Sequence, residues 1–129
     1  MSGVVLDASA LLALLKQESG ATKVAGVLAV SRMSAVNYAE VVSHFVHASM
    51  PAHKVDAMLG PLPVVIVDVD EALARVAGQL RAITASAGLS LGDRFCLALS
   101  LREGLPAWTA DKQWQTIADV VGVEVEIIR

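Results

Sequence analysis

The run Val4-Val5-Leu6-Asp7-Ala8-Ser9-Ala10-Leu11 changes its backbone preference at a single acidic residue. Its first three residues are apolar and mostly β-branched, which predicts a strand over residues 4–6. The residues that follow are helix formers with Ser9 near their start, so a helix is predicted over residues 8–16. The chain therefore opens with a strand that passes directly into a helix.

The same alternation continues along the chain, because extended stretches are separated by helix-forming stretches that end near Gly or Pro. A run of four β-branched residues at 64–67 is expected to be a buried strand. Strands joined through helices need crossover connections, so we predict an α/β fold with three α/β/α layers and a mainly parallel central sheet. The further predicted strands are 32–34, 64–67, 107–109 and 123–128, and the further helices are 21–29, 36–48, 52–59, 71–87, 90–103 and one before the last strand.

The composition is that of one folded domain. A chain of 129 residues buries roughly two-thirds of its unfolded surface. Hydrophobic residues make up 55%, charged residues 18% and aromatic residues 4%, so the apolar content comes from small and aliphatic side chains and intrinsic disorder is excluded. We expect a single domain over residues 1–129.

Charge, cysteine content and hydropathy argue against several classes of protein and of binding site. Uncharged apolar runs such as 8–15 are shorter than the roughly 18 residues that span a bilayer, and the start Met1-Ser2-Gly3 has no basic region of a signal peptide. A lone Cys96 excludes an internal disulfide and a thiolate metal site, which favours the reducing cytoplasm. A net charge of −3 argues against binding nucleic acid by bulk attraction alone. A nucleic-acid substrate would need metal ions or a local basic patch.

Two acidic residues follow predicted strands. Asp7 comes directly after the first strand, and Asp111 follows Thr109 by two residues. Ligands of open parallel sheets bind beyond the carboxyl ends of the strands, so both side chains should lie at one rim if these strands are neighbours. An acidic residue between a strand and a helix is also an ordinary helix cap, and the pattern leaves both interpretations open.

Two further acids lie on predicted helices. Asp93 completes the capping-box pattern that begins at Ser90, yet it shares a face with Cys96 on a helix so apolar that we expect it to be buried. Periodicity puts Glu40 on a polar face with Asn37, Ser43, His44 and His47, for which a solvated surface is the simple explanation. The histidines lack the close H-E-x-x-H spacing typical of a zinc site.

Gathered together, these four carboxylates would repel one another by up to about 4 kcal/mol per pair. A divalent cation would offset that repulsion, and oxygen ligands select hard ions such as Mg²⁺ or Mn²⁺. Such ions serve phosphodiester hydrolysis, because they activate a water molecule and neutralise phosphate oxygens.

Four stretches, in this order, resemble the PIN-domain ribonucleases, and in particular the VapC-type toxins of bacterial toxin–antitoxin pairs. The resemblance covers essentially the whole chain, and the third stretch is the most specific. The stretches are Val4-Val5-Leu6-Asp7-Ala8-Ser9-Ala10-Leu11, Ser34-Ala35-Val36-Asn37-Tyr38-Ala39-Glu40-Val41, Gly88-Leu89-Ser90-Leu91-Gly92-Asp93-Arg94-Phe95-Cys96-Leu97-Ala98-Leu99 and Leu105-Pro106-Ala107-Trp108-Thr109-Ala110-Asp111-Lys112-Gln113-Trp114.

The resemblance implies roles for particular residues. The four acids, Asp7, Glu40, Asp93 and Asp111, would bind Mg²⁺ or Mn²⁺ on a PIN-like fold, and a metal-activated water would attack an RNA phosphodiester. Ser9 and Thr109 would orient ligands or substrate. The resemblance also implies a homodimer that is inhibited by a VapB-type antitoxin, through which the complex binds promoter DNA.

Candidates for contacting RNA phosphate are Arg94, Lys112, Arg32 and Lys16, each of which is also explained as an ordinary surface charge or ion pair. The alternative function is a catalytically silent PIN-like protein-binding module. A phospho-accepting receiver domain and a haloacid-type phosphatase fit poorly, because Asp7-Ala8-Ser9 lacks the second carboxylate that both require after the first strand.

Overall fold

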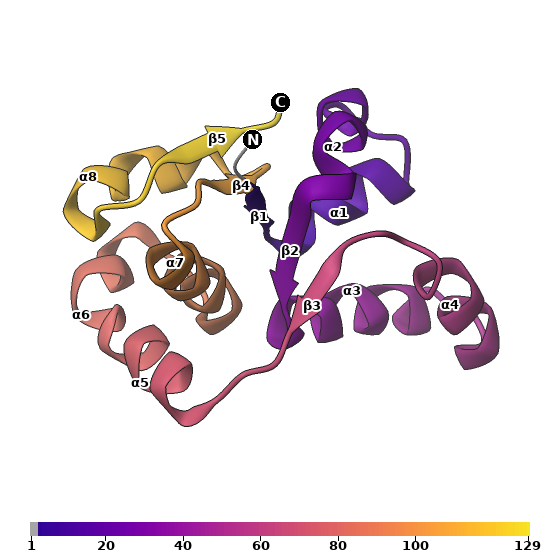
Figure 1. The fold of residues 1–129 in the computed structure, drawn as a ribbon, viewed down its shortest axis with the longest axis horizontal. Coiled ribbons are helices and arrows are strands. Elements are labelled where there is room, and N and C mark those ends of the chain that lie inside the picture. The colour runs from indigo at the N-terminus through magenta and orange to yellow at the C-terminus, as the bar shows by residue number, and fades with distance from the viewer. Residues whose placement is uncertain (1–2) are drawn as a thin grey trace.

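The strands of the computed structural model, which describes residues 3–129, form one parallel sheet in the order β3-β2-β1-β4-β5 (Figure 1). Every neighbouring pair runs in the same direction. Met1 and Ser2, at which the expected absence of a signal peptide was judged, lie outside the described residues. The strands are β1 (Val4–Leu6), β2 (Ser31–Ser34), β3 (Val65–Val67), β4 (Ala107–Thr109) and β5 (Val125–Ile127).

Helices cover both faces of this sheet, and each face has its own core (Figure 1). The predicted α/β/α layering and parallel sheet are therefore confirmed. One face carries α1 (Ala8–Leu15), α2 (Ala21–Val27), α3 (Ala35–His47) and α4 (Ala52–Leu59). The other carries α5 (Glu71–Gln79), α6 (Arg81–Thr84), α7 (Leu91–Glu103) and α8 (Ala118–Val121), and the short 3₁₀ segments are η1 (Leu28–Val30), η2 (Ala85–Ala87) and η3 (Lys112–Thr116).

Two predicted elements differ from the structure. The helix expected over 71–87 breaks at Leu80 into α5, α6 and η2, and Leu80 and Thr84 are both buried, with the Thr84 hydroxyl donating to the Leu80 carbonyl at 2.8 Å. The strand expected at 64–67 is present as β3, but the expectation that it is buried is wrong, because β3 lies at the sheet edge and Val65 is 57% exposed.

The helix α7 is the central packing element of the second face. It is buried from Arg94 to Ser100, as its apolar composition predicts, and it packs against β1, β2, α3 and α5. The predicted capping box is present, since the Asp93 backbone N–H donates to the Ser90 hydroxyl at 3.2 Å and the Ser90 backbone N–H donates to the Asp93 carboxylate at 2.8 Å. Asp93 is thereby fixed in the first turn of a buried helix.

The strands that precede two of the acids are neighbours. β1 pairs with β4 so that Leu6 lies opposite Trp108, and the carboxyl ends of both strands meet at one rim of the sheet. Asp7 and Asp111 therefore leave the sheet at the same rim, as expected if the strands were adjacent. Ser34 ends β2 at that rim too, and it caps α3, the helix that carries Glu40.

Among residues 3–129, no helix has the length and apolar character needed to cross a membrane. Cys96 is a free cysteine buried within α7.

Gly20 offers a test of how the first helices meet the end of the sheet. Its φ of +96° suits glycine, and an added Cβ would lie 2.7 Å from the Ile128 carbonyl oxygen. Gly20→Ala should therefore destabilise the fold by more than about 1 kcal/mol. Gly26, in α2 with nothing within 4 Å, is the matched control, and Gly26→Ala should stabilise by up to about 1 kcal/mol. Urea unfolding of both variants measures this, and equal stability of the two would contradict the contact.

Candidate active site

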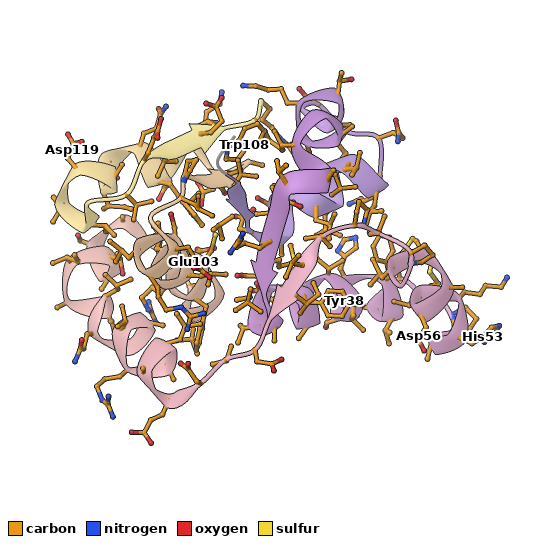
Figure 2. All side chains as sticks on the ribbon, viewed as in Figure 1. Tyr38, His53, Asp56, Glu103, Trp108 and Asp119 are labelled. Carbon is orange, nitrogen blue, oxygen red and sulfur yellow. The ribbon has the colours of Figure 1, made fainter. Side chains whose placement is uncertain are left out.

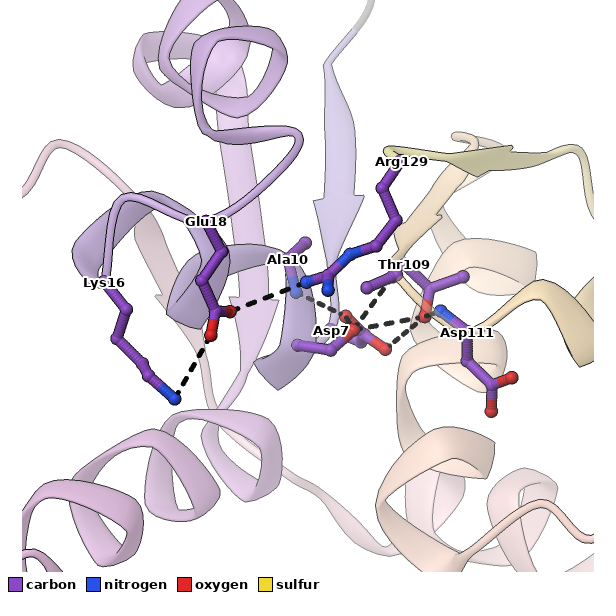
Figure 3. A network of polar contacts seen from close by, with 9 residues as sticks. Asp7, Ala10, Lys16, Glu18, Thr109, Asp111 and Arg129 are labelled. Carbon is purple, nitrogen blue, oxygen red and sulfur yellow. Dashed lines mark hydrogen bonds and ion pairs between the residues drawn. The ribbon is translucent and has the colours of Figure 1, made fainter.

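Asp7 is buried and its carboxylate is fixed by three hydrogen bonds (Figure 3). Oδ1 accepts from the Ser9 hydroxyl at 2.7 Å and from the Ala10 backbone N–H at 2.9 Å. Oδ2 accepts from the Thr109 hydroxyl at 2.6 Å. The bond to Ala10 is the N-cap of α1, so the capping role holds, while the bond to Thr109 joins the ends of β1 and β4.

The hydroxyls of Ser9 and Thr109 extend this network along the end of β4. The two oxygens lie 3.3 Å apart, the Ala110 backbone N–H donates to Ser9 Oγ at 2.9 Å, and the Asp111 backbone N–H donates to Thr109 Oγ1 at 3.1 Å. The Asp111 side chain is exposed and points away from the contact between Asp7 and Thr109 (Figure 3). Ser9 and Thr109 therefore hold the Asp7 carboxylate, while the Asp111 carboxylate stays in contact with solvent.

Glu40 reaches the site from the middle of α3. Its Oε1 accepts from the Asn37 side-chain amide at 2.9 Å, and the same amide nitrogen donates to the Gly92 carbonyl at 2.9 Å. Gly92 immediately precedes Asp93, so this contact joins α3 to α7 beside two candidate acids. Periodicity places Asn37 on the same helix face as Glu40 but predicts no role for it; its position three residues before Glu40 is the signal that could have indicated this contact.

All four predicted acids line a single hollow of about 350 Å³. They come from the ends of β1 and β4, from α3 and from the first turn of α7. Their convergence answers the question that periodicity left open for Glu40, whose position alone resembled that of a surface residue. The lining residues are Asp7, Ala8, Ser9, Leu12, Glu40, His44, Asp93 and Asp111.

Burial makes the negative charge of this hollow costly. It raises the pKa of Asp7 to about 6, although the hydrogen bond from Thr109 lowers it. Burial likewise raises the pKa of Glu40 and of Asp93, and the charge of a neighbouring carboxylate adds to each shift: Asp93 acts on Glu40, and Asp111 acts on Asp93. The arrangement therefore favours uptake of protons or of a cation.

The donor set of the hollow suits a hard divalent cation, because carboxylate oxygens are the protein ligands that Mg²⁺ and Mn²⁺ accept. Within residues 3–129, no three His, Cys, Asp or Glu side chains are arranged to hold a metal ion as they stand. Mg²⁺ commonly uses one or two carboxylates and keeps several waters, so a preformed three-residue cage is not needed. The assignment of the four acids as metal ligands therefore stays a prediction.

Two of the four basic residues proposed to contact RNA are used elsewhere in the fold. Arg94 is buried, and its Nη1 donates to the Leu89 carbonyl at 3.1 Å. Arg32 pairs at 3.5 Å with Glu103, which lies about 15 Å along α7 from Asp93. The burial of Arg94 corrects the expectation that it faces an RNA strand, whereas the contact of Arg32 with RNA stays a prediction.

The other two basic side chains are exposed. Lys16 pairs with Glu18 at 3.4 Å, and the same glutamate pairs with Arg129 at 3.5 Å (Figure 3). Lys112 directly follows Asp111, which lines the hollow, and its side chain is exposed. Lys112 is therefore the basic residue whose predicted contact with RNA phosphate agrees best with its position.

The comparison with family models decides the classification, because a model of the PIN domain matches residues 4–120. This chain belongs to the PIN domain family. The family predicted from the four sequence stretches is therefore confirmed. A comparison with curated proteins finds no match.

Solved structures share this PIN domain fold over nearly all of their length. The DNA-bound VapBC complex from Salmonella typhimurium matches with a TM-score of 0.73 and 18% identity, over 98% of this chain and 98% of that chain. Mycobacterium tuberculosis VapC20, a toxin that cleaves the sarcin-ricin loop, matches with a TM-score of 0.74 and 17% identity, over 88% and 94%. VapBC2 from Rickettsia felis, bound to a promoter DNA fragment, matches with a TM-score of 0.69 and 17% identity, over 95% and 96%.

Asp7→Asn tests the electrostatic strain in the PIN domain hollow. The folded state raises the pKa of Asp7 from 3.8 to about 6, so it binds the proton more tightly than the unfolded chain does, and wild-type stability falls as the pH rises through this range. In EDTA, Asp7→Asn should be more stable than wild type above pH 6, by up to about 3 kcal/mol, and this gain should vanish below pH 4.

Thermal or urea unfolding across pH 4–8 measures that difference. Asparagine retains an oxygen to cap α1 and an amide to donate to Thr109, so the local hydrogen bonds survive the change. A variant that is less stable than wild type at every pH would show that Asp7 serves the fold as a cap and carries no electrostatic strain.

Proposed function

We propose that this PIN domain is a metal-dependent endoribonuclease and the toxin of a VapBC-type toxin–antitoxin pair. The observation that carries the proposal is the convergence of Asp7, Glu40, Asp93 and Asp111 on one hollow at the carboxyl end of a parallel sheet. Parallel α/β sheets bind their ligands at this edge. Membership of a family whose proteins are generally nucleases supports the assignment of the hollow to phosphodiester chemistry.

Mg²⁺ or Mn²⁺ would be held by two or more of these four carboxylates, with water completing its coordination. When bound, the cation supplies positive charge at the phosphate oxygens and lowers the pKa of the water that attacks phosphorus. The water oxygen would form a new bond to phosphorus while the bond from phosphorus to the departing ribose oxygen breaks. The water would release a proton to solvent, and the departing oxygen would take one up from solvent.

The side chains of this protein have separate parts in that reaction. Thr109 and Ser9 donate hydrogen bonds that keep the Asp7 carboxylate in one orientation, which preserves its geometry when substrate enters. Lys112, exposed beside Asp111, would contact a phosphate of the RNA strand. Because the acids repel phosphate until their charge is neutralised, RNA binding in the hollow depends on the cation.

We further propose that residues 1–129 form a single PIN domain that assembles as a homodimer in the cytoplasm with a VapB-type antitoxin. The shared fold with the VapBC complexes supports this assembly. DNA binding would then belong to the antitoxin, in agreement with the chain's net charge of −3.

Purified protein should cleave RNA in Mg²⁺ or Mn²⁺ and stop when EDTA is added. Asp93→Asn should reduce cleavage at least about 100-fold, since even residues that only orient metal ligands contribute about 10- to 100-fold. Asparagine can still accept the capping bond from Ser90, so the fold is retained. Mapping cleavage sites on total RNA with wild type and variant side by side measures activity and substrate together.

The matched control for that experiment is Asp119→Asn. Asp119 is an exposed aspartate on α8, pointing outward and absent from the lining of the hollow (Figure 2). This variant should cleave like wild type. Cleavage that persists in EDTA or in Asp93→Asn would overturn the metal-dependent mechanism, and a folded protein that cleaves no RNA would favour the silent protein-binding module.

Expression in bacteria tests the toxin role independently of purified material. Expression of the wild-type protein should arrest growth, whereas expression of Asp93→Asn should not. Co-expression of the adjacent small gene product should restore the growth of cells that express the wild-type protein. Colony counts after induction, with the protein level checked for both forms, measure the effect. Harmless overproduction of protein that cleaves RNA in vitro would argue against a toxin while leaving the nuclease intact.

A further inference from the structure

The Asn37 side chain is 1% exposed and lies between the helices that carry two of the acids. Its amide nitrogen donates to Glu40 Oε1 at 2.9 Å and to the Gly92 carbonyl at 2.9 Å. Its amide oxygen accepts from the hydroxyl of Ser34, the N-cap of α3, at 2.7 Å. The buried amide therefore has partners at both ends and a fixed orientation.

Gly92 closes the other side of Glu40. A Cβ at this position would lie 2.6 Å from the Glu40 carboxyl carbon, closer than real side-chain contacts allow. The Glu40 carboxylate thus rests against the backbone of α7, one residue before Asp93, and any side chain at position 92 would displace it. Gly92 lies in a helix, so no unusual backbone angle requires glycine at this position. Glycine is needed there because its lack of a side chain leaves room for the Glu40 carboxylate.

We propose that Asn37 and Gly92 are positioning residues that fix the Glu40 carboxylate beside Asp93 so that the two can share a divalent cation. The inference rests on the proposed metal-dependent function. Asn37 directs the carboxylate by a hydrogen bond, and Gly92 provides the space that it occupies. Glu40 needs such help because it projects from the middle of a helix, whereas Asp7 and Asp93 are oriented by capping bonds in their own first turns.

A purely structural role for the pair would tie α3 to α7 and affect stability alone. Gly92→Ala separates the two roles, because alanine favours a helix and the atoms it meets belong to the movable end of the Glu40 side chain. This variant should unfold at or above the wild-type temperature, yet its Glu40 carboxylate must shift. Asn37→Leu removes the donor while keeping a side chain of similar size.

Calorimetric titration of the metal-free full chain with Mn²⁺ alone is the test. Asn37→Leu and Gly92→Ala should each raise the Mn²⁺ dissociation constant about tenfold. The matched control is Gly78→Ala in α5, a helical glycine with nothing within 4 Å, which should bind Mn²⁺ like wild type. Unchanged Mn²⁺ affinity in Gly92→Ala would overturn the inference, and this variant decides the question if Asn37→Leu does not fold.

Glu40→Gln distinguishes failure of the inference from failure of the proposed function. If Glu40 helps to hold the cation, Glu40→Gln weakens Mn²⁺ binding, and adding Gly92→Ala to it produces no further loss, because residues that act through one group are not additive. A full additional tenfold loss in the double variant would overturn the positioning role. Wild-type Mn²⁺ affinity in Glu40→Gln would instead remove Glu40 from the proposed metal site, and the inference with it.

Discussion

Burial of carboxylates that also repel one another is the constraint on which this structure depends. Each close pair costs up to about 4 kcal/mol at an effective dielectric near 20, so the fold must hold these groups together against their charge. It does so by burying Asp7 with three hydrogen bonds and by fixing Asp93 in a capping box on a buried helix. Burial first, and the charge of a neighbouring carboxylate second, raise the pKa values of Asp7, Glu40 and Asp93. A hollow built in this way favours the uptake of protons or of a cation.

Capping and chemistry are compatible roles in this fold. Asp7 caps α1, Asp93 lies in the first turn of α7 and Asp111 caps η3, so three of the four acids occupy helix N-termini where the backbone N–H groups favour negative charge. Capping by these side chains therefore does not exclude the metal-binding role that is proposed for them. Glu40 is the exception, because it lies within a helix and depends on Asn37 for its orientation.

The distribution of basic residues fits a site that relies on a cation. Arg94 and Arg32, which the sequence analysis named as candidate phosphate contacts, make a backbone hydrogen bond to Leu89 and an ion pair with Glu103. Of the four candidates for contact with RNA phosphate, Lys16 and Lys112 are exposed, and Lys112 directly follows Asp111 in the chain. With a net charge of −3, a protein of this kind gains little from general attraction to nucleic acid.

The amino-acid sequence by itself determined the alternation of strands and helices, the buried helix α7 and the capping box at Ser90, because periodicity and capping act over a few neighbouring residues. The tertiary structure alone decided that β3 lies at an edge, that the helix after Asp70 breaks at Leu80, that Arg94 is buried and that Glu40 faces the hollow. These features depend on which elements pack together across long separations, and local periodicity carries no information about the partner. A family resemblance predicted the convergence of the acids, but the contact between Asn37, Glu40 and Gly92 required the packed helices themselves.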